Sequence, residues 1–254
     1  MGRLLKAEWY ILRKSKWFWL TLLIFLVPAA LNARRVYDSA VFNPGSTVVM
    51  ELFFAVALGF YEKGLAMAIA AGIIVGGSVR KGLVENPLAL GAGRGQLYIS
   101  KWLGQMAIAV PMVLLPSILT IILRVTDKGF PYEQLTAESI GQLCLYLLSA
   151  VFQAWAYVSI FCLLLLNFGQ KIRTVVLCAA IVQIDFWLAS GLAANNVTAY
   201  FAGPFGALMH QFAEFVQTDQ MMTSAFFATW LPAIAIILAS TFAGIMLFSK
   251  RDAA

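Results

Sequence analysis

Apolar runs long enough to cross a lipid bilayer dominate this sequence, and they constrain its fold more than any motif does. Hydrophobic residues make up 61% of the 254 positions, charged residues make up 12%, and the mean hydropathy is +0.84. A soluble globular domain carries about 45 to 50% apolar and about 25% charged residues. A soluble fold cannot hide this much apolar surface, whereas a bilayer accepts it in spans of roughly 20 residues. The sequence therefore predicts an all-α integral membrane protein with about six transmembrane helices.

The predicted spans follow the apolar runs. Together they form a single transmembrane domain that covers residues 1–254. They are residues 17–32, 61–79, 101–123, 140–168, 174–192 and 225–248. Residues 47–60 are apolar but contain Glu51, and the sequence leaves open whether they belong to the second span or form an interfacial segment. Gly72 and Gly76 form a small-residue pair in the second span, which favours close helix packing. Residues 193–224 are predicted to be extracellular.

The basic residues indicate the orientation of the chain. Six spans put both termini, residues 80–100 and the hinge at 169–173 on one side of the membrane. Of the 18 Lys and Arg residues, all but five lie on that side, and the five are Arg34, Arg35, Lys63, Arg124 and Lys128. Because basic residues are enriched in cytoplasmic loops, both termini are predicted to be cytoplasmic. The net charge of +6 therefore reads as a topology signal and not as a sign of nucleic-acid binding.

Residues 1–16 are predicted to form an amphipathic helix on the membrane surface. Leu5, Trp9 and Leu12 recur at helical spacing and alternate with basic residues that suit lipid head groups. The residues alone do not distinguish a topology anchor from a connecting helix that transmits force.

The predicted cytoplasmic loop, residues 80–100, contains an apolar face on a segment too polar to span the membrane. That face consists of Leu83, Val84, Pro87 and Leu88, and Asn86 followed by Pro87 is a favourable helix start. A short helix of this kind needs a partner surface to cover it. An interfacial loop without a partner is the alternative that the residues leave open.

Signatures of enzymes and metal sites are missing from the sequence. No phosphate loop ending in Gly-Lys-Ser or Gly-Lys-Thr occurs, nor does any His-Glu-x-x-His or Gly-x-Ser-x-Gly motif, so no catalytic residue and no metal site is predicted. His210 and Glu214 are four residues apart, but two ligands do not make a site. Asp185 is a lone carboxylate in the fifth span and is interpreted as structural. Cys144, Cys162 and Cys178 are interpreted as small buried hydrophobic residues.

Three stretches of the sequence resemble one family, the permease subunits of type-2 ABC exporters, and in particular the small permeases of lantibiotic and bacteriocin self-immunity systems. The first is the opening LLKAEWYILRKSKWFW, and the last is the ending FSKRD at 248–252. The middle stretch is the loop, where the matching positions are Gly82, Asn86, Arg94, Tyr98, Ser100 and Lys101. Leu83 stands where the family usually has a threonine.

The resemblance implies a single permease domain in a bacterial plasma membrane, with both termini cytoplasmic. It implies that the opening helix is the connecting helix and that residues 80–100 hold a coupling helix, which docks on a separate ABC ATPase subunit. The implied coupling residues are Gly82, Leu83, Val84, Asn86, Pro87, Leu88 and Arg94. The segment at 201–215 corresponds to the family's outer hairpin near the exit.

The implied partners are the cytosolic ATPase, a second permease (identical or homologous) and membrane lipid. This chain needs no cofactor of its own, because ATP and Mg would be bound by the ATPase. The expected cargo is amphipathic: an antimicrobial peptide, a drug or a lipid-like molecule. Two rival functions remain at this stage, an ion- or proton-coupled secondary transporter centred on Asp185 and a stand-alone membrane immunity protein.

Overall fold

The computed structural model of the chain describes five continuous segments and several short pieces. The segments are residues 2–14, 93–126, 136–168, 172–192 and 223–250, and the pieces lie within 16–26, 52–72 and 203–211. The five helices are α1 (Gly2–Lys14), α5 (Arg94–Val125), α6 (Ala137–Phe168), α7 (Ile172–Leu192) and α9 (Thr223–Lys250). All regular secondary structure in these described residues is helical, as the sequence predicted.

Four of these helices are long and apolar enough to cross a membrane: α5, α6, α7 and α9. They contain the predicted third to sixth spans, so the chain is a multi-pass helical membrane protein. Most of the first predicted span, residues 73–79 of the second and most of the segment predicted to be extracellular lie outside the described residues. Helix α5 begins at Arg94, seven residues before the apolar run that predicted its span.

The prolines in α5 do not end the helix. Pro111 and Pro116 both lie inside it, and so does Pro232 in α9. Ser117 and Thr120 donate hydrogen bonds to backbone carbonyls one turn earlier, at 2.8 and 2.9 Å. Proline has no backbone N–H, so it leaves a carbonyl one turn earlier without its usual donor. Side-chain hydroxyls and neighbouring helices can donate to carbonyls in this region, which makes proline tolerable in a membrane helix.

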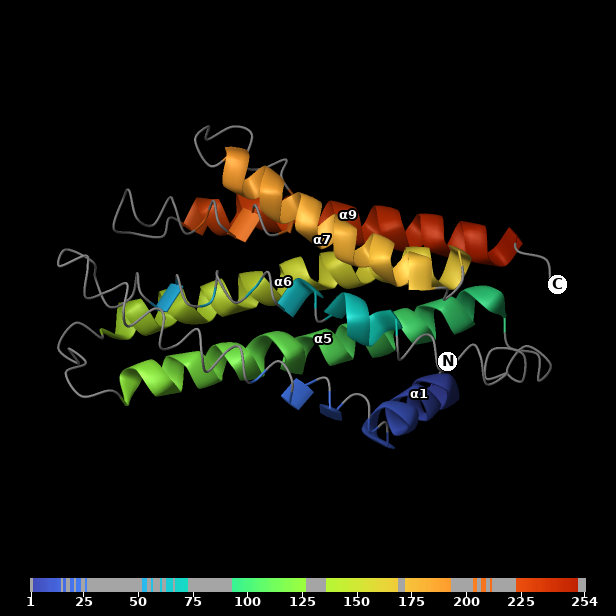
Figure 1. Ribbon diagram of the computed structural model, residues 1–254, viewed down its shortest axis with the longest axis horizontal. Coiled ribbons are helices and arrows are strands. Elements are labelled where there is room, and N and C mark those ends of the chain that lie inside the picture. The colour runs from blue at the N-terminus through green and yellow to red at the C-terminus, as the bar shows by residue number, and fades with distance from the viewer. Residues whose placement is uncertain are drawn as a thin grey trace.

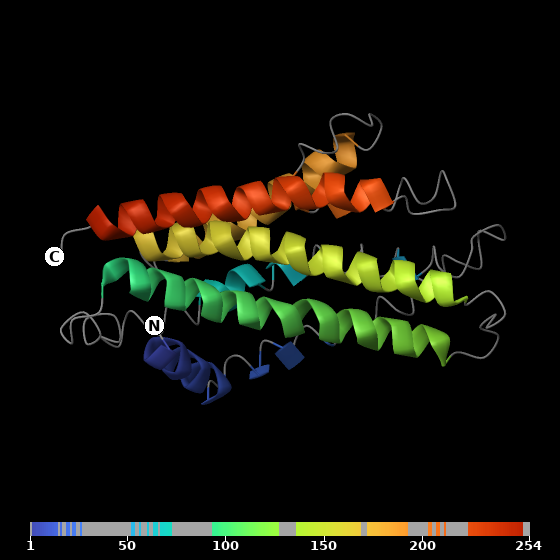
Figure 2. The ribbon, with the colours of Figure 1, turned by 180° about the vertical axis from the view of Figure 1, so that it is seen from behind.

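The long helices lie side by side, with α6 between α5 and α9 (Figure 1). The opposite view shows the same order, with α1 packed obliquely against α5 at one end of the bundle (Figure 2). The start of α5, the end of α6, the start of α7 and the end of α9 all lie at that end (Figure 1). Within their 18-residue apolar windows, 61% of α6 but only 22% of α9 is buried, so α6 is the central helix and α9 presents most of its surface outward.

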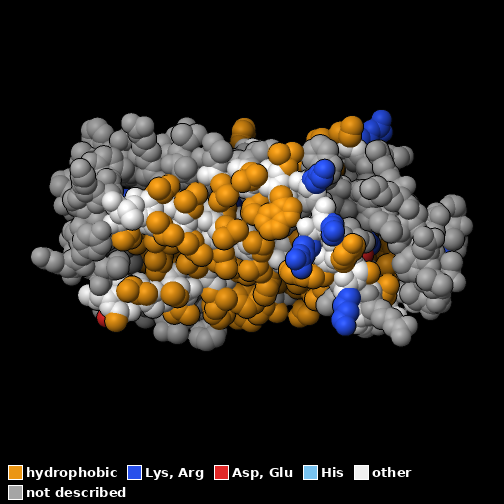
Figure 3. Space-filling view, turned by 90° about the horizontal axis from the view of Figure 1, so that it is seen from below, with side chains coloured by type: hydrophobic (Ala, Val, Ile, Leu, Met, Phe, Trp, Pro, Cys, Tyr) orange, Lys and Arg blue, Asp and Glu red, His pale blue; other side chains and the backbone are white. Residues whose placement is uncertain are grey.

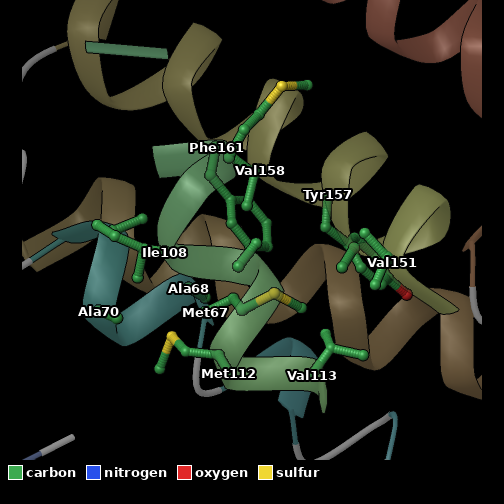
Figure 4. Close-up of a cluster of buried hydrophobic side chains, with 14 of the residues drawn as sticks. Met67, Ala68, Ala70, Ile108, Met112, Val113, Val151, Tyr157, Val158 and Phe161 are labelled. Carbon is green, nitrogen blue, oxygen red and sulfur yellow. The ribbon is translucent and has the colours of Figure 1, made fainter. Parts of the chain in front are cut away.

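The core lies where pieces of the predicted second span meet α5 and α6. Figure 4 shows Met67 and Ala68 beside Met112 of α5 and Phe161 of α6. Gly72 lies so close to α7 that an added Cβ would be 2.5 Å from a methyl group of Val175. Only a small residue permits this approach, which is the packing role predicted for Gly72, while Gly76 lies outside the described residues.

One face of the molecule combines a broad apolar surface with basic side chains. Figure 3 shows hydrophobic side chains across the middle of the bundle, with Lys and Arg gathered toward one end. A helical membrane protein presents this distribution, because lipid covers the apolar belt while basic groups lie at head-group level.

Candidate functional site

The predicted coupling residues divide between described and undescribed parts of the chain. Residues 82–88, which hold the predicted coupling helix, lie outside the described residues. Arg94 is described and opens helix α5. Leu5 and Leu12 belong to α1, but their side chains are outside the described set, whereas Trp9 is described and is 60% exposed. The site can therefore be built from the start of α5, directly after the predicted coupling loop.

The first two turns of α5 are joined to the end of α9. Arg94 donates a hydrogen bond from Nη1 to the backbone carbonyl of Ser249 at 3.4 Å. Tyr98, one turn later, is fully buried, and its ring lies 6.0 Å from that of Phe248. Gly244 permits this contact, because a Cβ at that position would overlap the Tyr98 hydroxyl. Arg94 also suits its place electrostatically, since a cation near a helix C-terminus is stabilised by the helix dipole.

The next turn of α5 is joined to α1 by a buried ion pair. Lys101 Nζ lies 2.5 Å from Glu8 Oε1, and the two side chains are 4% and 14% exposed. A buried charge needs a partner, and breaking such a pair by removing one member typically costs about 3 to 5 kcal/mol. Ser100 contributes no link between helices, because its hydroxyl donates to the carbonyl of Leu97 at 2.8 Å. Lys101 and Glu8 therefore fix α1 against α5.

The three stretches that carry the family resemblance meet at this junction. Arg94, Tyr98 and Lys101 are spaced by four and three residues, so they occupy neighbouring positions along one side of α5. Glu8 comes from the opening stretch, and the Phe248–Ser249 pair comes from the ending, 155 residues away from Arg94. We call this group of Glu8, Arg94, Tyr98, Lys101 and Phe248 the α5 junction.

The hydroxyl of Tyr98 is buried and has no hydrogen-bond partner among the described residues. Buried polar groups are nearly always bonded, so an orphaned hydroxyl in a tight helix contact is unusual. Its packing against Gly244 and Phe248 explains why the ring is held there. No contact in the described structure explains why the residue is tyrosine and not phenylalanine.

A second polar site surrounds Asp185 in α7. Asp185 is 5% exposed and accepts a hydrogen bond from the Tyr157 hydroxyl of α6. Gly203 has a positive φ of 88° and lies against the carboxylate, where a Cβ would be 2.9 Å from Oδ1. This close approach requires glycine, both for the backbone conformation and for space. The contacts agree with a structural acid bonded to a neighbouring span.

Sequence reasoning missed the burial of Lys63. It was counted with the basic residues outside the membrane, but its side chain is 4% exposed and donates to Ser117 Oγ of α5 at 2.7 Å. A lysine inside the predicted span 61–79 was the available signal. Ionisable groups at membrane depth are rare and often functional, so Lys63 and Asp185 together deserve a functional test.

A hydrogen-bonded network joins α6, α9 and the piece at 203–211. Ser149 accepts hydrogen bonds from Trp230 Nε1 at 2.7 Å and Gln211 Nε2 at 3.3 Å. Gln211 also bonds the Thr229 hydroxyl, and Gln153 donates to the Thr229 carbonyl at 3.0 Å. Tyr146 donates to the carbonyl of Leu208 at 3.2 Å. These bonds fasten part of the predicted outer hairpin onto the bundle.

The described residues contain no group of three His, Cys, Asp or Glu side chains that would suit a metal ion. His210 and Glu214 lie outside the described residues, so their predicted spacing on a helix is not tested. Cys162 and Cys178 are buried, as predicted, but the prediction for Cys144 was wrong because it is exposed. Cys144 lies beside the exposed Leu145 on an outward face of α6, where a bilayer supplies the apolar surroundings.

Comparison of the chain with models of protein families and with curated proteins finds no match.

Proposed function

We propose that this chain is the membrane-spanning subunit of an ATP-driven exporter of the ABC type, with the ATPase on a separate polypeptide. The observation that carries the proposal is the α5 junction. The opening helix, the loop motif and the chain ending carry the family resemblance together, and residues from all three are in contact. Sequence similarity alone does not require such contacts, so the convergence is independent support.

The junction also supplies the mechanical connection that a coupling helix needs. A push on residues 82–90 would reach Arg94 within a few residues and pass through Lys101 to α1 and through Tyr98 to α9. Rigid helices joined by buried contacts move as units, which is how small displacements at a docking site become changes of access. Two permeases and two ATPases would then switch a path between the two halves from inward to outward access.

The proposed topology keeps six spans with both termini in the cytoplasm, the first two spans being supplied by residues 17–32 and 61–79. Most of the described basic residues belong to α1, to the starts of α5 and α7 or to the end of α9, and these lie at one end of the bundle (Figure 1): Lys6, Arg13, Lys14, Arg94, Lys101, Arg173 and Lys250. Arg124 is at the opposite end, in the last turn of α5. This asymmetry favours placing the α1 end in the cytoplasm of a bacterial cell.

The test is a charge in the proposed coupling helix. Leu88→Glu would place an unpaired carboxylate into the contact with the ATPase, at a cost of several kcal/mol, enough to weaken docking at least about tenfold. We expect the ATPase to be lost during purification in mild detergent and export to fall with it. Gln134→Glu in the predicted outer loop is the matched control and should retain both. A Leu88→Glu permease that keeps its ATPase and exports normally would refute the assignment.

A secondary transporter is the second candidate, because the structure buries a cation as well as an acid within the bundle. Lys63 and Asp185 are both at least 95% buried, and Gly64, next to Lys63, packs against Tyr157, the hydrogen-bond donor to Asp185. Ionisable groups of this kind can carry protons or ions. Transport that follows the proton gradient and needs no ATPase would favour this candidate, and toxin binding without any transport would favour a stand-alone immunity protein.

A further inference from the structure

The contact between α1 and α5 leaves an open cavity of about 400 Å³ on the outer surface of the bundle. Its floor and walls are Leu22 together with Ala107, Ile108, Pro111 and Leu115 of α5. These side chains are apolar, and Leu22 and Ile108 are nearly fully buried beneath the opening. Its size lies within the range of about 300 to 1,000 Å³ for small-molecule sites.

The side chains that could bind a polar group lie on the α1 side of this cavity. They are Trp9, Arg13 and Trp19, which complete the lining. Trp19 donates its indole N–H to the backbone carbonyl of Arg13 at 3.2 Å. This hydrogen bond does not involve the guanidinium group of Arg13. Both tryptophans are more than half exposed. Tryptophan and arginine at one end of an apolar groove match the division of a lipid into head group and chain.

The charges around the cavity favour a negative head group. Glu8 is the single acidic residue of α1, and its carboxylate is taken by Lys101. Arg13 has no carboxylate partner among the described residues, and exposed Lys14 and Lys16 follow it within three residues. Figure 3 shows basic side chains gathered beside the apolar surface on this side of the molecule. Guanidinium groups bind phosphate with paired hydrogen bonds, which adds specificity to the attraction.

We propose that this cavity binds an anionic phospholipid, with the phosphate on Arg13 between the two tryptophans and an acyl chain along Ala107–Leu115 of α5. The span from residue 107 to residue 115 is about 12 Å long at 1.5 Å per residue, room for the upper part of one acyl chain. The inference does not depend on the exporter function, since a lipid at this place would brace the α1–α5 contact in any membrane protein of this fold. A second copy of the chain over the same face is the alternative occupant.

The test uses the tryptophans as reporters in vesicles of equal parts phosphatidylcholine and phosphatidylglycerol. Bromine on an acyl chain quenches a nearby indole, so the bromine is placed on one lipid class in one sample and on the other class in a second. We expect brominated phosphatidylglycerol to quench more, with a relative affinity roughly fivefold higher, the factor corresponding to about 1 kcal/mol for one basic residue at an anionic surface. The double variant Trp9→Phe/Trp19→Phe should abolish the excess, which assigns it to this cavity.

Three further variants distinguish lipid binding in the cavity from a general attraction of anionic lipid to the basic residues. Arg13→Gln removes the proposed phosphate ligand, and Ala107→Phe fills the groove from an exposed position. In both variants, brominated phosphatidylglycerol and brominated phosphatidylcholine should quench equally. Lys14→Gln removes the same charge one residue away, at a position that does not line the cavity, and should retain the preference. An equal loss in Lys14→Gln, or no preference in the unmodified protein, would overturn the proposal. So would an intermolecular disulfide formed by Ala107→Cys, because it would mean that a second copy covers the groove.

Discussion

The ion pair between Glu8 and Lys101 offers the sharpest test of the α5 junction. Its nitrogen and oxygen atoms are 2.5 Å apart, and Lys101 is 4% exposed. Glu8→Gln would leave the lysine ammonium buried without its carboxylate, at a typical cost of about 3 to 5 kcal/mol. The protein can avoid that cost by releasing α1, so we expect the equilibrium between docked and released α1 to shift toward release by roughly 100- to 4,000-fold.

Amine acylation measures that shift directly. In the unmodified protein a water-soluble acylating reagent should label Lys6 and Lys250, which are exposed, far faster than Lys101. In Glu8→Gln the labelling rate of Lys101 should rise by the same factor as the shift toward released α1. The rates of exposed Lys6 and Lys250 set the upper limit. Mass spectrometry after short exposures resolves the three sites in one sample.

A double-mutant cycle completes the argument. Lys101→Met removes the more deeply buried charge, and the pair Glu8→Gln with Lys101→Met leaves neither charge unpaired. We expect the double variant to be much more stable than the sum of the single changes implies, because the coupling energy of the pair is recovered. If Lys101 reacts as fast as Lys250 in the unmodified protein, or if Glu8→Gln leaves its rate unchanged, the buried ion pair does not hold α1.

Three further predictions follow from the fold and the second polar site. For topology, an impermeant thiol reagent applied to intact cells should label single cysteines in the predicted outer loops and should not label one at Gly95; the outer positions are Ser46, Thr126 and Thr218. Asp185→Asn should leave transport dependent on ATP and insensitive to a collapsed proton gradient, because the acid is bonded structurally; activity that follows the gradient and vanishes in this variant would support the secondary transporter instead. Gly244→Ala should lower the unfolding free energy in detergent by about 1 to 3 kcal/mol, because the added methyl overlaps Tyr98. The control Gly141→Ala, where a Cβ meets nothing within 4 Å, should be neutral or stabilising, and equal effects of the two changes would contradict the close contact.

The sequence by itself determined the membrane class and the positions of four long helices. Those properties depend on local composition, because a run of apolar residues is stable in lipid wherever its neighbours are placed. The same reasoning correctly predicted a close-packing role for Gly72 and the burial of Cys162 and Cys178. It also singled out Arg94, Tyr98 and Lys101 as residues that resemble a family motif, but it did not reveal which helices they would contact.

Only the tertiary structure decided which polar groups are partners. Lys101 and Glu8 are both common surface residue types, and nothing in their local sequence specifies that they meet in a buried pair. Lys63 was counted with the basic residues outside the membrane although it lies at the start of the predicted span 61–79, and only its contact with α5 shows that it is buried. Cys144 faces outward because other residues of α6 fill the core. The physical reason is that burial of a side chain depends on what packs against it from distant parts of the chain, whereas insertion of a helix into lipid depends on the helix alone.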